Sequence, residues 1–207
     1  NTPAGGVFSF SKGTPLINLA FAEQDKLLRC STLRLNGKIS LFTDNAATTS
    51  PTNNGTATEG IHLSPKLGAQ SIVQNLTIMT SSGAVLESIR NYGRLVSSLN
   101  AATSDENDFI SNSIGACCNG LDASSSYMVN SSGVSFSIPL HAGILQGTGV
   151  LPLGQAGTRG LKIQIELAAD SQVLFGNVAA AIYQVSDISL TADLIQLESK
   201  GPKGTLP

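Results

Sequence analysis

Few residues in this chain could do chemistry. The 207 residues include two histidines, His62 and His141, and three cysteines, Cys30, Cys117 and Cys118. A zinc site needs Cys, His or carboxylate ligands at characteristic spacing, and an adjacent cysteine pair without a nearby histidine does not supply it. Cys117 and His141 could in principle act as nucleophile and base, but the flanking residues match no nucleophile motif. We therefore predict no metal, no cofactor and no catalytic residue.

The carboxylates do not suggest an active site either. Asp105, Glu106 and Asp108 form a cluster that could bind a hard cation, but they lack the spacing of a calcium loop. Glu166 lies on the outward face of a predicted strand, where a solvated or interface charge is expected rather than half of a hydrolytic carboxylate pair. The glycine-rich segment 153–160 lacks the lysine and hydroxyl residues of a phosphate loop, and we interpret it as a turn. The chain is expected not to be an enzyme.

The cysteines and sequons say little about processing. An odd number of cysteines, two of them adjacent, does not form a disulfide framework, so we expect reduced thiols made in a reducing compartment. Sequons occur at Asn54, Asn75 and Asn130, but a chain rich in Ser, Thr and Asn generates them by chance.

Composition excludes several classes of function. Charged residues make up 13% of the chain and the net charge is −2, which is typical of a subunit whose surface is covered by partners; a secreted domain coated with Ser, Thr and Asn is the alternative. The 12 Lys and Arg are scattered, so direct nucleic-acid binding is not expected. No apolar run reaches the ~20 residues of a membrane span. The absence of Trp and the 5% aromatic content argue against stacking on sugars or bases.

Alternating apolar residues predict strands along most of the chain. Segments 134–140 and 161–167 each alternate apolar with polar or small residues, and an apolar corner rich in Gly and Pro joins them. Segment 31–41 places four aliphatic residues on one face, with Gly37 among them, which indicates a bulge or a close approach at that glycine. Further strands are predicted at 16–21, 71–80 and 179–197, the last with a phase slip after residue 194.

One segment has a helical period instead. Apolar residues spaced 4, 3, 4 and 3 apart predict an α-helix over about 84–99; they are Val85, Ile89, Tyr92, Val96 and Leu99. Segments 43–60 and 100–133 are polar and are expected to be long loops. The predicted fold is all-β, an antiparallel jelly-roll sandwich with one inserted α-helix. We divide the chain into an N-terminal arm with a first short strand (1–26), a jelly-roll domain (27–198) and a linker or tail (199–207).

Three segments together resemble a known family. They are Leu27-Leu-Arg-Cys-Ser-Thr-Leu-Arg-Leu-Asn-Gly-Lys-Ile-Ser-Leu41, the strand and predicted helix over 71–95, and Phe136-Ser-Ile-Pro-Leu140 with the Leu-Pro-Leu and Glu-Leu that follow it. In this order they resemble the N-terminal jelly roll of double-jelly-roll major capsid proteins from polinton-like viruses, virophages and related icosahedral DNA viruses. The resemblance covers roughly residues 27–197.

The resemblance implies a structural role without catalysis. Such proteins form trimers that tile an icosahedral shell, so the implied partners are copies of this chain and other capsid proteins, and the implied location is the virion, after synthesis in the host cytoplasm or nucleus. A double-jelly-roll subunit needs about twice this length, so the chain would be half of one. The alternatives are a single-jelly-roll penton or minor capsid protein, a secreted β-sandwich for adhesion or carbohydrate binding, and a hydrolase that uses Cys117 or the 105–108 acidic cluster.

Overall fold

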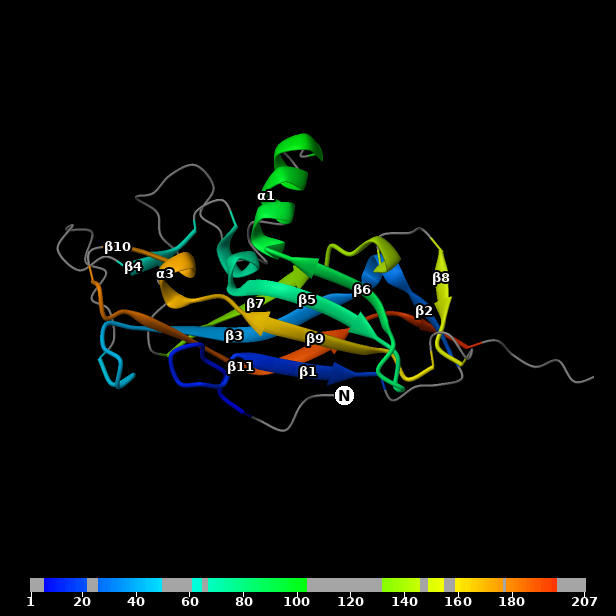
Figure 1. Ribbon diagram of the computed structural model, residues 1–207, viewed down its shortest axis with the longest axis horizontal. Coiled ribbons are helices and arrows are strands. Elements are labelled where there is room, and N and C mark those ends of the chain that lie inside the picture. Colours follow the sequence, from blue (N-terminus) through cyan, green and yellow to red (C-terminus); the bar gives the residue numbers. More distant parts are fainter. Residues whose placement is uncertain are drawn as a thin grey trace, which may run out of the picture.

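The computed structural model describes residues 6–21, 26–49, 61–64, 67–103, 132–145, 149–154, 159–176 and 178–196. Two antiparallel sheets form its body (Figure 1). Sheet I contains, in spatial order, β1 (Leu16–Ala20), β9 (Lys162–Leu167), β5 (Val73–Met79) and β6 (Val85–Arg90). Sheet II contains β11 (Ile182–Thr191), β3 (Arg34–Phe42) and β7 (Val134–Pro139). The predicted all-β antiparallel sandwich is confirmed.

Shorter elements extend both ends of the sandwich. One end carries a small sheet of β12 (Leu194–Ile195), β2 (Leu27–Arg29) and β8 (Val150–Pro152), and the other carries the ribbon of β10 (Leu174–Gly176) and β4 (Ile61–Leu63) (Figure 1). The helices are α1 (Tyr92–Thr103) and α3 (Asp170–Val173), with 3-10 turns η1 (Cys30–Thr32), η2 (Gly68–Ile72) and η3 (Gly143–Leu145). None of the helices in the described ranges is long and apolar enough to cross a membrane.

Aliphatic side chains at alternate positions fill the space between the sheets. In β3 the predicted inward residues Leu35, Ile39 and Leu41 are buried, and the polar residues between them face outward. In β9, Ile163 and Ile165 are buried in the same way. Each such side chain stabilises the fold by roughly 1.5–3 kcal/mol through removal of apolar surface from water. The core therefore holds the two sheets face to face.

The strands of the two sheets pair in a nested order along the chain. Phe8 forms an antiparallel bridge with Val185 of β11, β1 pairs with β9, β3 pairs with β7, and β5 pairs with β6. The first segment thus pairs with the last, the second with the next to last, and so on inward to the β5–β6 hairpin. Two further pairings, β11 with β3 and β9 with β5, roll this ribbon into two sheets.

The predicted helix boundary was wrong. Residues 85–90 form strand β6, and α1 begins only at Tyr92. Val85 and Ile89 fit a strand as well as a helix, because a four-residue spacing places both on one face in either structure. Pairing with β5 selects the strand. Asn91, with a φ of 55°, then turns the chain into the helix.

A β-bulge in β11 lies opposite Gly37. The register between β11 and β3 shifts between Ser186 and Ser189, so Asp187 and Ile188 both stand opposite this single glycine. The sequence predicts a phase slip in this segment, but after residue 194. The chain has left sheet II by then, because residues 194–195 pair with β2 as β12. The register shift instead lies at residues 187–188, where β11 passes Gly37 of β3.

Gly37 is also the predicted close approach. A Cβ atom there would lie 2.7 Å from Cδ1 of Ile188 and 2.8 Å from Cζ of Phe136, so these two core side chains occupy the space that a side chain would need. Phe136 stands directly across from Gly37 on β7, and its ring covers the glycine. The bulge and the aromatic ring together compensate for the missing side chain.

One carboxylate closes the side of the sandwich between β6 and β7. Glu87 of β6 accepts hydrogen bonds from the backbone N–H groups of Gly143, at 2.7 Å, and Ile144, at 2.9 Å. Both donors belong to η3, which follows β7. Because Glu87 belongs to sheet I and its donors follow a strand of sheet II, these bonds fix one sheet against the other.

A second carboxylate closes the opposite side, between β1 and β11. Asp170, just after β9, accepts hydrogen bonds from the backbone N–H of Tyr183 in β11, at 2.9 Å, and from the hydroxyl of Ser11 in the N-terminal arm. The arm is held further by the backbone N–H of Leu167, which donates to Pro15 at 2.8 Å. The N-terminal arm therefore runs across the open edge and connects the two sheets.

Asp44 organises the start of the loop predicted over 43–60. Its carboxylate accepts hydrogen bonds from both the backbone N–H and the hydroxyl of Thr48 and Thr49, and these bonds hold the pKa of Asp44 well below its usual value. Residues 50–60, most of the predicted loop 100–133 and the predicted tail 199–207 lie outside the described residues.

We predict that Gly37→Ala lowers the free energy of unfolding by about 1–3 kcal/mol, because the new methyl group must displace Ile188 or Phe136. Gly93→Ala is the matched control. The nearest atom to a Cβ there is Cδ1 of Leu67 at an ordinary 3.7 Å, so the alanine should stabilise α1 by up to about 1 kcal/mol. Urea unfolding of both variants tests this, and equal effects of the two substitutions would contradict it.

We also predict that Glu87→Gln lowers the free energy of unfolding by about 1–2 kcal/mol. The amide oxygen can still accept one of the two hydrogen bonds, but the NH₂ group then faces the other backbone N–H, which loses its acceptor. Glu166→Gln is the control. Its carboxylate accepts one hydrogen bond from Asn75, which an amide oxygen can also accept, so the change should be under about 0.5 kcal/mol. Chemical unfolding measures both values.

Candidate functional site

Within the described ranges, the residues of catalytic type are not assembled into one centre. Cys30 in η1 is a buried free thiol, and burial raises its pKa, which disfavours the reactive thiolate. His62 of β4 stacks on Phe175 of β10, with ring centroids 6.3 Å apart. His141 follows β7. No group of three or more His, Cys, Asp or Glu in this part of the chain could hold a metal ion.

Glu166, predicted to face outward, does so and supports the sheet. Its Oε2 accepts a hydrogen bond from Nδ2 of Asn75 at 2.6 Å, across the β9–β5 pair. The Oδ1 of Asn75 accepts from the backbone N–H of Asn91. Asn75, the sequon residue in a strand, is thus bonded on both sides. The other candidates lie outside the described residues; they are Cys117, Cys118, Asp105, Glu106, Asp108, Asn54 and Asn130.

A buried polar network at the base of α1 is not predicted by the sequence. The Tyr92 hydroxyl donates to the carbonyl of Pro139 and accepts from the backbone N–H of His141 at 2.9 Å. Nε2 of Gln70 donates to the same carbonyl at 3.3 Å. Burial raises the pKa of Tyr92, so the phenol remains neutral. The network joins α1 and η2 to the end of β7, and its only sequence signal is the apolar stripe that contains Tyr92.

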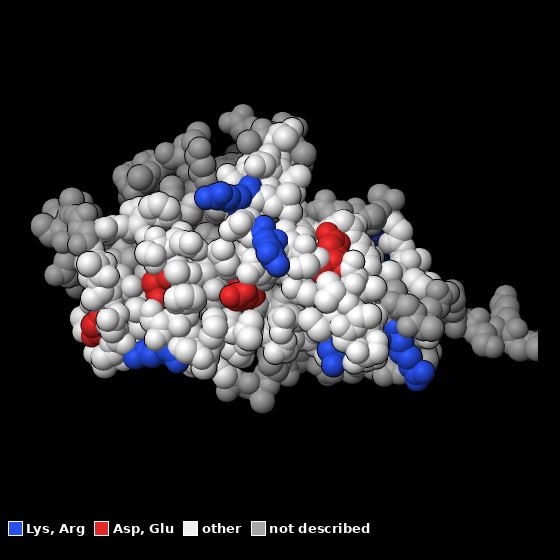
Figure 2. All heavy atoms as spheres, viewed as in Figure 1, with Lys and Arg blue, Asp and Glu red and all other residues white. Residues whose placement is uncertain are grey.

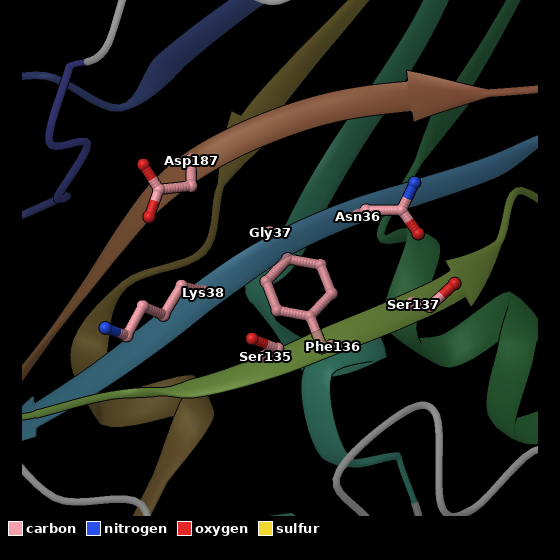
Figure 3. A pocket seen from close by; sticks show the side chains of 7 residues that line it. All are labelled: Asn36, Gly37, Lys38, Ser135, Phe136, Ser137 and Asp187. Carbon is pink, nitrogen blue, oxygen red and sulfur yellow. The ribbon is translucent and has the colours of Figure 1, made fainter.

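Residues of sheet II line an open depression of about 460 Å³ (Figure 3). They are Asn36, Gly37, Lys38, Ser135, Phe136, Ser137 and Asp187. A carbohydrate-binding module would need an exposed aromatic ring in such a depression. Phe136 is only 3% exposed, so its ring offers no stacking surface. The depression instead presents hydroxyls, one amide, one ammonium and one carboxylate.

A smaller hollow of about 310 Å³ lies beside the first turn of α1. Part of its polar lining is engaged in the fold, because Nε2 of Gln74 donates to Oδ1 of Asn91 at 3.0 Å and the Ser71 hydroxyl donates to the carbonyl of Gly68. This arrangement stabilises the turn between β6 and α1.

The face of the molecule that includes sheet I carries isolated charges on a mostly uncharged background (Figure 2). On sheet I, Nε2 of Gln164 donates to Oδ1 of Asn18 at 3.0 Å across adjacent strands. Apolar side chains are exposed at scattered positions, which are Val7, Phe10, Leu16, Val85, Leu86, Leu95, Val150, Phe175 and Ile195. Apolar side chains that are exposed singly are normal on a protein surface, so these positions by themselves mark no binding site.

We predict that acid destabilises the fold partly through His141. Burial lowers the pKa of this half-buried imidazole, so the folded protein favours the neutral form while the unfolded chain takes up a proton near pH 6.5. The contribution is complete above that pH and is lost progressively as the pH falls below it. His141→Gln should flatten this part of the stability profile in urea unfolding between about pH 5 and about pH 7.5, a range that brackets the ordinary pKa of histidine. His62→Gln controls for the loss of a histidine as such, and equal profiles for both variants would contradict the prediction.

Comparisons with protein-family models and with curated proteins find no match for this chain. Function must therefore be inferred from the strand order, the bonded carboxylates that join the sheets, and the low charge content of the chain.

Proposed function

We propose that this chain is a structural subunit of an icosahedral viral capsid, which associates through trimers into a shell and performs no catalysis. The observation that supports this best is the nested strand pairing. In a jelly roll, the first strand pairs with the last, the second with the next to last, and so on inward to a central hairpin. The long two-stranded ribbon that results is rolled into two facing sheets. The pairings of Phe8 with β11, β1 with β9, β3 with β7 and β5 with β6 follow that rule.

The character of the surface also supports a shell protein. A subunit in a closed shell buries roughly 800 Å² or more against each stable neighbour, and charged residues are depleted at the centre of such contacts. Only 13% of this chain is charged. The outward face of β7 carries hydroxyls, and those of β3 and β9 combine amides or hydroxyls with two charged residues each. The β7 face can therefore be desolvated with little loss of charge hydration, and the charges on the other two faces would have to be paired across a contact.

The three segments that resemble double-jelly-roll capsid proteins coincide with the framework of the sandwich. They supply β2 and β3, then β5 with β6 and the start of α1, and finally β7 through β9. In this proposal the sandwich is one half of a double-jelly-roll subunit. A single-jelly-roll penton or minor capsid protein is the alternative assignment, and it shares the same test of self-association.

We predict that the purified chain self-associates reversibly into trimers or larger closed particles. Sedimentation velocity and light scattering over a wide concentration range measure the mass, and negative-stain microscopy shows the outline. Circular dichroism must first show a folded β protein. A folded chain that stays monomeric at every concentration and at both low and high salt would overturn the proposal.

A further inference from the structure

We propose that the depression on sheet II is a two-fold contact between copies of this chain, in which Lys38 of each copy faces Asp187 of the other. The inference rests on the proposed function only in requiring that copies associate; a two-fold contact joins copies in pairs, so it is additional to the contacts within a trimer. It goes beyond that function by assigning a surface, a symmetry and two residues to one contact.

Asp187 sits where local structure alone would favour glycine. Its φ of 53° is in the left-handed region, which glycine adopts freely and which Asp and Asn adopt more readily than most other residues. Asn91 shares this conformation, but its side chain accepts a hydrogen bond from Gln74 and so contributes to the fold. Asp187 is exposed, and its carboxylate has no hydrogen bond or ion pair with any described residue. The bulge thus directs an unpaired carboxylate outward.

Lys38 is a neighbour of the bulge but does not neutralise Asp187. It pairs in register with Ser186 of β11 on one side and with Ser135 of β7 on the other. Its stem lies toward β7, because a Cβ atom at Gly133 would be 2.8 Å from Cε and 3.0 Å from Cγ of the lysine. The glycine leaves room for this stem. Lys38 and Asp187 therefore stand on different sides of the same depression (Figure 3).

A surface with one positive and one negative charge, neither paired with a described residue, is complementary to itself. A two-fold axis that runs over β3, parallel to the strands, brings Lys38 of one copy opposite Asp187 of the second and the reverse. The strands of the two copies are then nearly aligned, as in ordinary face-to-face sheet packing. The two facing depressions leave space for the lysine stems. The remaining polar lining groups are small hydroxyls and an amide, which can approach without a clash of charge.

Charge reversal tests this reciprocity. Lys38→Glu sets two negative charges against each other and Asp187→Lys sets two positive charges, so each variant alone should form the paired contact at least about tenfold more weakly than the unmodified chain. An equimolar mixture of the two variants should regain association, because both contacts across the axis again join opposite charges. Analytical ultracentrifugation with one variant labelled by a fluorophore measures the mixed species.

Lys162→Glu and Asp193→Lys form the matched control pair, because both side chains are exposed and lie outside the depression. Neither variant should change association. Asp187→Asn, which tolerates the left-handed backbone, should also weaken association if the charge matters, and thermal unfolding identifies any variant that fails to fold. Reversal variants that associate like the unmodified chain, or a mixture that does not recover, would overturn the contact.

Carbodiimide cross-linking gives an independent readout, since it joins an amine to a carboxylate only in direct contact. In a mixture of ¹⁴N and ¹⁵N chains, a 38–187 cross-link between differently labelled peptides is expected, and a cross-link confined to one label would contradict the contact. If the unmodified chain never associates, the proposed function and this contact both fail. If it associates and the charge variants have no effect, only this contact fails.

Discussion

The structure depends on closing the two open sides of a β-sandwich whose interior is largely apolar. Buried aliphatic residues hold the sheets face to face but do not determine how one is placed along the other, because the hydrophobic effect has no direction. Directional bonds supply that information. Glu87 on one side and Asp170 on the other each accept two hydrogen bonds, and both bridge between sheet I and sheet II. The Tyr92 network adds a third connection at the end of β7.

The sequence predicts a strand correctly wherever one face is buried, because the alternation of apolar residues then identifies the strand whichever neighbouring strand it pairs with. Leu35, Ile39 and Leu41 alternate over the whole of β3, and a shift of one residue would turn them all to solvent. Segment 85–90 was assigned wrongly because its apolar residues satisfy both periods and only pairing with β5 decides between them. Likewise, the bulge in β11 depends on its register with β3, which one strand's sequence does not contain.

The candidate site was predictable only in part, for the same reason. Gly37 stands out in the sequence because a glycine on an inward face must have a cause, and the cause is the Phe136 ring together with Ile188. The sequence does not identify Asp187, because its left-handed conformation arises from the bulge, where Asp187 and Ile188 both stand opposite Gly37. The position of the Lys38 stem depends on Gly133, which precedes a different strand and lies far along the chain.

The use of carboxylates links the fold to the proposed role. The described part of the chain holds six Asp and Glu residues, and four of them accept hydrogen bonds within the fold; these are Asp44, Glu87, Glu166 and Asp170. Three of these four carboxylates thus serve a turn or a junction between the sheets, and the fourth, Glu166, bonds across two strands of sheet I. A protein that must remain separate in water gains from free surface charge. A subunit that is covered by its neighbours is favoured by a low surface charge. On such a surface, a carboxylate without a bond inside the fold, such as Asp187, contributes strongly to the specificity of the contact.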